Sequence, residues 1–216
     1  VLEEILDPKS SVYPKLWKIL IGAKNIIDVD IILFDLGAGT NRHTIDFFSG
    51  SHVGIVTVLP EPTSIENAYV FMKSSLIRVV ENTGSRCNAW AATADLVQAL
   101  TTSEVSLDHG LKSTLLQYRN RYPHLIDSIF LALQGKILGI VVNQIRSQRD
   151  IDVGETMSAI SSNVFGFDSR ALGFLNHDDV AWKSLRNRRL LLIDFPHSLL
   201  AARIGDIANN LLQYMA

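Results

Sequence analysis

The stretch IILFDLGAGT, residues 31–40, places an aspartate and a glycine-containing loop directly after an apolar run. The apolar run is typical of a buried β-strand, and Asp35 follows it where such a strand would end. An ionisable side chain at the carboxyl end of a strand usually marks a binding edge in an α/β protein. Gly37 and Gly39 lack side chains, so the backbone of this loop can approach a ligand closely.

Three further apolar runs predict strands like the first. The four predicted strands are residues 29–34, 53–59, 137–142 and 172–175. They are near-continuous rather than alternating, as expected for parallel strands covered on both faces. Helical patterns separate them, most clearly at 64–81, where Pro62 and a capping box of Thr63 and Glu66 mark the start. We therefore expect an α/β fold with a mostly parallel sheet flanked by helices.

Residues 84–135 interrupt this alternation, because they contain no credible strand. Their apolar spacing predicts three helices, which we interpret as a helical insertion within a single domain spanning 1–216. The insertion either covers the sheet or presents a partner-binding face. A last amphipathic helix is expected at 198–215. Its one cation, Arg203, favours core packing over membrane binding, because membrane-surface helices usually carry several.

Composition excludes several classes of protein. The 216 residues carry a formal charge of −2, whereas a dedicated nucleic-acid binder is normally basic. A single cysteine, Cys87, fits a reducing cytoplasm, and no apolar run is long enough to span a bilayer. The six histidines show no zinc-ligand spacing. The cluster of Arg186, Arg188 and Arg189 is interpreted as ordinary cations at a helix end, in preference to a contact with DNA or acidic lipid.

Polar residues follow the predicted strands, at the edge where parallel α/β sheets bind ligands. Asp35 is suited to Mg²⁺, a hard cation that prefers oxygen ligands. An asparagine amide offers a donor and an acceptor side by side, which matches an adenine edge. We therefore expect one nucleotide site, with the loop 60–64 alongside, built from Asp35, Gly37, Gly39, Asn143, Asn176, His177 and Asp178.

Longer segments carry a resemblance to a known family. They are DVDIILFDLGAGTNRHTIDFF (28–48), VGIVTVLPEPTSIENAYVFMK (53–73), LGIVVNQIRS (138–147) and ALGFLNHDDVAWKSLRNRRLLLIDFPHS (171–198). Together they resemble the MinD/ParA-like ATPases, near the branch of flagellar-number regulators, over roughly 28–83 and 136–200. The PEPTSIENAY loop and helix start is the most specific piece of this resemblance.

The resemblance implies a P-loop ATPase of the deviant Walker-A class that dimerises around ATP and Mg²⁺ and responds to a protein activator or cargo. Asp35 matches the Walker-B aspartate that positions Mg²⁺ and its water. Gly39 matches the glycine whose N–H senses the γ-phosphate, with Gly37 in the same loop. Asn143 matches the adenine contact. The stretch that borders the base is Asn176, His177 and Asp178.

One defining motif of that family is missing from these 216 residues. No G-x-x-x-x-G-K-[ST] loop occurs, and the nearest pair, in Gly22-Ala23-Lys24-Asn25, lacks the first glycine and the hydroxyl. Compared with that family, we expect the first βαβ unit, of about 30 residues or more, to be missing, which leaves the P-loop NTPase-like fold N-terminally incomplete. The chain is then either a fragment or a degenerate relative. We expect little or no ATP hydrolysis by these 216 residues. Two functions stay open: an ATP-dependent switch in spatial organisation of the cell (division site, flagella or chromosome), or a non-catalytic interaction or dimerisation module.

Overall fold

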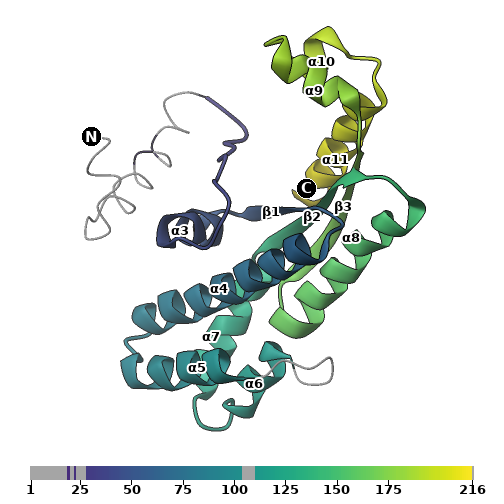
Figure 1. Ribbon diagram of the computed structural model, residues 1–216. Helices are drawn as coiled ribbons and strands as arrows, with labels where there is room; N and C mark the ends of the chain where they lie inside the picture. Colours follow the sequence, from purple (N-terminus) through teal and green to yellow (C-terminus); the bar gives the residue numbers. More distant parts are fainter. Residues whose placement is uncertain (1–18, 20–21, 23–27, 104–109, 216) are drawn as a thin grey trace.

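The computed structural model describes residues 19, 22, 28–103 and 110–215, and shows an α/β arrangement with helices on a small parallel sheet (Figure 1). The sheet contains β1 (Val53–Val58), β2 (Ile137–Ile145) and β3 (Asp168–Asn176), in the order β1-β2-β3. The helices are α3 (Arg42–Gly50), α4 (Pro62–Arg86), α5 (Trp90–Thr102), α6 (Leu111–Gln117), α7 (Pro123–Gln134), α8 (Gln148–Ile160), a π-helical turn η1 (Ser161–Phe165), α9 (Asp179–Arg186), α10 (Leu191–Asp194) and α11 (Leu199–Met215).

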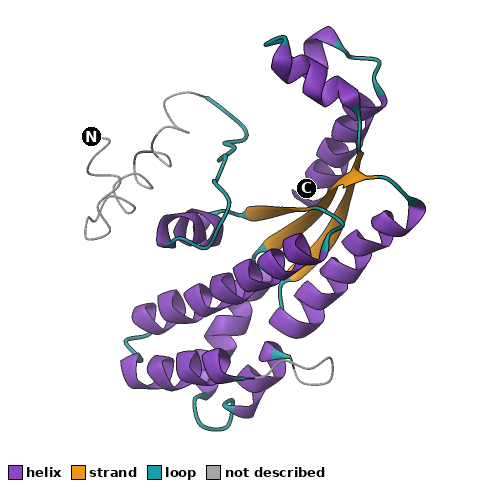
Figure 2. Cartoon of the chain, in the orientation of Figure 1, coloured by secondary structure: helices purple, strands orange, loops and turns teal. Residues whose placement is uncertain are grey.

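β2 is the central strand, and it pairs in parallel with both neighbours. Its residues 138–142 are all buried, as the near-continuous apolar run predicts for a strand covered on both faces. α4 and α8 cover one face of the sheet, while α11 packs on β3 from the other (Figure 2). The predicted α/β class with a parallel sheet and flanking helices is thereby confirmed.

β1 differs from this prediction because only one of its faces is covered. Buried and exposed positions alternate along it, and the side chain of Ile55 is 37% exposed. Val56 and Val58 face the side of α4 and are buried. The continuous apolar run of β1 therefore does not mean that both faces of this strand are buried.

The first predicted strand, at 29–34, is wrong for this structure. Residues 29–40 form no ladder with the sheet, and Leu33 is 80% exposed. Strand hydrogen bonds require a neighbour about 4.8 Å away. Here a cavity separates the segment from β1, so its backbone has no ladder partner along that side.

The helical character of 84–135 is confirmed by α5, α6 and α7, although α4 runs on to Arg86. Among the described residues of this region no strand occurs; 104–109, with His109, lie outside them. Side chains from all three helices join the same buried cluster as β2, including Leu96, Leu115, Ile126 and Leu133. α5 and α7 reach that cluster by packing against α4.

The start of α4 departs from the predicted capping box. The helix begins at Pro62 with Glu61 as its N-cap, and Glu61 provides no side-chain capping bond. Ser64 instead turns back, where its Oγ accepts a hydrogen bond from the Leu59 N–H at 2.9 Å. Pro62 itself supports the helix start, because the first turn needs no N–H from it.

α3 is attached to the body by two cations, the half-buried Arg78 and the buried Lys136. Arg78 of α4 donates to Asp46 at 2.5 Å and to Glu81 at 2.8 Å. Burial lowers the pKa of Arg78, but its hydrogen bonds with both carboxylates outweigh this and raise it. Lys136, 6% exposed, donates from Nζ to the Phe48 carbonyl at 2.8 Å and to the Ser49 carbonyl. These are carbonyls of the last turn of α3, which a cation stabilises.

Gly84 lies where α4 packs tightly against Thr93 of α5. A Cβ on Gly84 would overlap the hydroxyl of Thr93, which is 8% exposed. We expect Gly84→Ala to lower the free energy of unfolding by about 1–3 kcal/mol, because packed interiors resist added volume. Gly205→Ala on α11 is the matched control, since a Cβ there meets nothing within 4 Å. It should raise stability by about 0.5–1 kcal/mol. Urea unfolding measures both, and equal effects would contradict this packing.

Burial lowers the pKa of Lys136 to about 8. Between about 8 and the ordinary value of 10.5 the unfolded chain binds more protons than the folded one, so stability must rise with pH there. The rise expected from this group is on the order of 3 kcal/mol. Lys136→Met should remove it, whereas Lys73→Met, at a partly exposed lysine, should retain it. Urea midpoints measured across this pH range test the difference; identical slopes in both variants would be inconsistent with a buried, neutralised Lys136.

Candidate functional site

The carboxyl ends of the three parallel strands meet at one side of the sheet, which we call the carboxyl edge. It comprises residues 59–64 after β1, 143–147 at the end of β2, and 176–178 after β3. Register fixes their proximity, because Val58 pairs with Val142 and Ile145 pairs with Asn176. Ligands bind at this side of open α/β sheets. The structure thus brings Asn143, Asn176 and His177 together.

Asn143 lies in an irregular part of β2. The register with β3 shifts between Val142 and Ile145, and Gln144 has a positive φ of 58°. The half-buried Asn143 accepts a hydrogen bond at Oδ1 from the Gln144 N–H at 2.9 Å. This local bond holds the amide at the end of the strand, where the shift of register displaces it from the regular ladder.

Asn176 carries the least satisfied polar group of the carboxyl edge. Its side chain is half-buried, and its Oδ1 is shielded from solvent without a hydrogen-bond partner. Leaving a buried acceptor unsatisfied costs about 1–3 kcal/mol. A ligand that donates an N–H to this oxygen would recover that cost.

His177 and Asp178 have different surroundings. The exposed His177 donates its backbone N–H to the Ile145 carbonyl at 3.0 Å, which ties the loop to β2. Asp178 is the N-cap of α9, and its Oδ1 accepts from the Val180 N–H at 2.8 Å. The carboxylate of Asp178 therefore has a structural task, and its place in a ligand site stays a prediction.

Asp35, Gly37 and Gly39 lie apart from this group. All three are exposed, in the segment that does not join the sheet. A Cβ at Gly37 or at Gly39 would meet nothing within 4 Å, so close packing does not demand glycine at either position. Gly39 has a φ of +105°, however, which L-residues rarely adopt. Of the nearest glycine–lysine pair, Ala23, Lys24 and Asn25 lie outside the described residues.

A cavity of about 640 Å³ separates this segment from the sheet. Residues 30–36 form one wall, and α3, β1 and α11 form the others, with Ile55, Leu211 and Met215 among the lining side chains. The ring of Phe34 packs on that of Phe47, at 5.6 Å between centroids, and thereby holds the segment to α3. Asp35 lines this cavity rather than the carboxyl edge.

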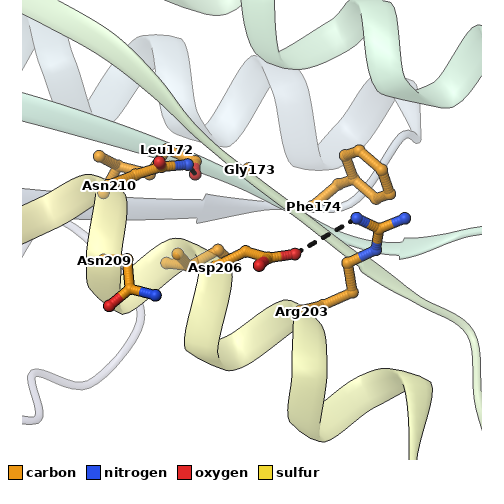
Figure 3. Close-up of a pocket in the computed structure, with 8 residues that line it drawn as sticks. Leu172, Gly173, Phe174, Arg203, Asp206, Asn209 and Asn210 are labelled. Carbon is orange, nitrogen blue, oxygen red and sulfur yellow. Dashed lines mark hydrogen bonds and ion pairs between the residues drawn. The ribbon is translucent and has the colours of Figure 1, made fainter.

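A second hollow, of about 290 Å³, lies between β3 and α11 and was not predicted from the sequence (Figure 3). Arg203 stacks over the Phe174 ring at 4.5 Å and pairs with Asp206 at 3.4 Å. Asn210 donates from Nδ2 to the Leu172 carbonyl at 2.8 Å. In the sequence, only the spacing of Arg203 and Asp206, three residues apart on a predicted helix, indicates that these two side chains can form an ion pair. These contacts anchor α11 to β3.

Neither metal binding nor membrane spanning has independent support in the described residues. There, no group of three or more His, Cys, Asp or Glu side chains is arranged to hold a metal ion. No helix of the described part is long and apolar enough to cross a membrane. Comparison with models of known protein families finds no match, and a search of curated proteins finds no significant match either.

The capping bond of Asp178 can be tested locally. Asp178→Ala should speed hydrogen exchange of the Val180 amide about fivefold, because losing a helix cap costs about 1 kcal/mol. Asp178→Asn should preserve most of the protection, since asparagine caps equally well. Asp179→Ala, in the first turn, is the control and should leave this amide unchanged. Exchange that is equally fast in the Asp178→Ala and Asp179→Ala variants would show that Asp178 does not cap α9.

Proposed function

We propose that the carboxyl edge binds the base of an adenine nucleotide and that the protein is a MinD/ParA-like nucleotide switch. The observation that carries this proposal is the unpartnered, solvent-shielded Oδ1 of Asn176, at the end of the strand that pairs with the strand of the half-buried Asn143. The exocyclic amine of adenine is a donor that Asn176 Oδ1 can accept, and the Asn143 amide supplies a donor and an acceptor for the ring edge. The resemblance in sequence supports the same assignment of Asn143.

Asp35, Gly37 and Gly39 would serve the phosphates. The exposed carboxylate of Asp35 is chemically suited to Mg²⁺, but no set of three ligands surrounds it in the described residues. Magnesium would therefore be held between Asp35, water and the nucleotide phosphates, as Mg²⁺ commonly is. Bound there, the ion supplies charge neutralisation to the phosphates. Gly39, with its φ of +105°, would direct a backbone N–H toward them.

This arrangement places the base and phosphate groups on separate parts of the chain. The cavity beside β1 lies between the segment of Asp35 and the sheet. For Asp35 to reach the phosphates of a nucleotide whose base lies at the carboxyl edge, this segment would have to move toward β1. In the proposed switch, ATP binding drives that approach and homodimerisation, and a protein activator or cargo reads the dimer. The cellular role that we propose is positioning of the division site, flagella or chromosomes. Hydrolysis by these 216 residues should be slight, because they contain no Walker-A loop.

A second candidate function is an interaction or dimerisation module without nucleotide chemistry. The specific observation that favours it is the cavity beside β1, where Ile31, Leu33 and Ile55 remain exposed. Apolar residues gathered around a hollow commonly mark contact surfaces. Light scattering with and without Mg-ATP distinguishes the candidates: a dimer independent of nucleotide favours the module, and one that forms only with ATP favours the switch.

The base site is tested with nucleosides, which need no phosphate cradle. We expect adenosine to bind weakly, with a Kd of roughly 0.1–1 mM, a binding free energy of about −4 to −5.5 kcal/mol. Asn176→Ala should weaken binding about tenfold, because it removes the acceptor for the exocyclic amine. Inosine, which carries a carbonyl in place of that amine, should lose a similar factor. Isothermal titration calorimetry measures the three affinities: adenosine with the unaltered chain, adenosine with the Asn176→Ala variant, and inosine with the unaltered chain.

The matched control is Asn209→Ala, which removes an exposed asparagine amide on α11. It should bind adenosine as the unaltered chain does. Equal affinity for adenosine and inosine, or no loss in the Asn176→Ala variant, would overturn the base site. An Asp35→Ala variant should bind adenosine normally and lose only the effect of Mg²⁺ on ATP binding.

A further inference from the structure

β2 contains one residue in a backbone conformation that strands do not use. Gln144 has a φ of 58°. Of the four non-glycine residues with a positive φ in the described part of the chain, it is the one that lies inside a strand. Asp28 and Asn88 are of the types that tolerate this conformation, whereas glutamine is not. Strained backbone of this kind persists only where the surrounding structure holds it, and it clusters at functional sites.

The chain on both sides of Gln144 is fixed in place. Val142 is buried and pairs with residues of both neighbouring strands. Ile145 is 5% exposed, and its carbonyl accepts a hydrogen bond from the His177 N–H at 3.0 Å. The register with β3 shifts between these two anchors, so the peptide group between Asn143 and Gln144 leaves the regular ladder. The conformation of Gln144 then decides how that peptide group is turned.

This peptide group orients the side chain of Asn143. The Gln144 N–H donates to Asn143 Oδ1 at 2.9 Å. Only the oxygen of an amide accepts hydrogen bonds, so a flipped amide would place the hydrogens of Nδ2 against the Gln144 N–H. The bond therefore fixes which end of the amide is the oxygen. Nδ2, for which the described residues provide no acceptor, remains available to donate to a ligand.

We propose that Gln144, through its backbone, makes the carboxyl edge select a 6-aminopurine over a 6-oxopurine. The inference rests on the proposed base site and adds the origin of its selectivity. Asn176 Oδ1 is an unpartnered acceptor, and the oriented Asn143 amide offers a donor. Adenine presents the complementary pair on its Watson–Crick edge, with the exocyclic amine as a donor and N1 as an acceptor.

A 6-oxopurine in the same orientation would reverse both contacts. Its carbonyl would face the acceptor of Asn176, and its N1–H would face the donor of Asn143. If the Asn143 amide could turn over, it would offer its oxygen to that N1–H and recover one of the two contacts. The bond from the Gln144 N–H prevents this. Gln144 is thus a positioning residue, because it acts through Asn143 and its own side chain need not touch the base.

The first test exchanges the donor for an acceptor. Asn143→Asp keeps an oxygen for the Gln144 N–H and replaces Nδ2 by a second oxygen, which is ionised at pH 7. Affinity for adenosine should fall at least about tenfold, because the N1 lone pair then faces a negative charge. Inosine, whose N1 carries a hydrogen, should bind no more weakly than before, so the preference for adenosine disappears or reverses. Isothermal titration calorimetry at pH 7 measures both affinities.

The matched control is Asn209→Asp, which makes the same chemical change at an exposed asparagine of α11. It should keep the preference of the unaltered chain for adenosine over inosine. An equal change of preference in the Asn143→Asp and Asn209→Asp variants would show that added charge, rather than the donor of Asn143, is responsible.

The second test separates the backbone of Gln144 from its side chain. Gln144→Gly and Gln144→Val both remove the exposed side-chain amide, but only glycine adopts a positive φ readily. Gln144→Gly should keep the preference for adenosine and raise the urea midpoint, because it relieves strain. Gln144→Val should lose most of the preference. Since Ile145 is fixed, a valine that returns to a negative φ must turn its N–H away from Asn143 Oδ1.

The orientation of the amide can also be measured without a ligand. Hydrogen exchange of the Gln144 amide should become about fivefold faster in Asn143→Ala, which removes the acceptor, and should stay slow in Asn143→Asp. The amides of residues 138–142 should remain protected in every variant, which shows that β2 is intact. Unchanged exchange of the Gln144 amide in Asn143→Ala would overturn the proposed bond.

The outcomes distinguish this inference from the proposed base site. An unaltered chain that shows no preference for adenosine over inosine would overturn both. A preference that is present in the unaltered chain and persists in either Asn143→Asp or Gln144→Val would overturn the positioning role of Gln144 and leave the base site standing. Loss of the preference in Gln144→Gly as well would assign the selectivity to the side chain of Gln144, which also contradicts the inference.

Discussion

The pairing of β2 with both of its neighbours is the constraint on which the rest of the structure depends. A buried strand must pair its backbone N–H and C=O groups, and β2 does so between β1 and β3. Once this register is set, the ends of all three strands must lie at the same side of the sheet. Asn143 and Asn176 therefore become neighbours although 33 positions separate them in the chain. The carboxyl edge is a consequence of the ladder, before any side chain contributes.

The parts of the fold that rest on local or self-contained patterns were predictable. The run around β2 is apolar throughout because both faces are covered, and the spacing of α5, α7 and α11 is helical because one stripe of each is apolar. The start of α4 at Pro62 follows from the absent N–H of proline. The capping box is absent because the helix already begins at Pro62 with Glu61 as its N-cap, so Thr63 lies inside the first turn. Thr63 and Glu66 have the right spacing for a capping box, but the hydroxyl that bonds to the turn before the helix is that of Ser64.

The parts that depend on a neighbour were not predictable. An apolar run such as 31–34 becomes a strand only when another strand lies beside it. Here a cavity of about 640 Å³ lies between this run and β1 instead. The less buried face of β1 borders the same cavity, and Ile55 on that face stays 37% exposed. For the site, the asparagines of β2 and β3 converge as expected, since their strands pair. Asp35 does not join them, because its position depended on the one predicted strand that is absent. The stack of Arg203 on Phe174 was invisible for a similar reason, since it joins β3 to a helix that approaches it only in three dimensions.

The carboxyl edge and α9 are connected through one short piece of chain. Asn176 ends β3, His177 bonds to β2, and Asp178 caps the helix that bears Trp182. The direction of α9 is thus set by the same turn that contributes to the edge. A ligand that donates to Asn176 Oδ1 would act on the residue two positions before the helix cap. Occupancy of the edge and the orientation of α9 therefore involve the same structural element. That element is three residues long, and the hydrogen bond from the Val180 N–H to Asp178 Oδ1 fixes it to the first turn of α9.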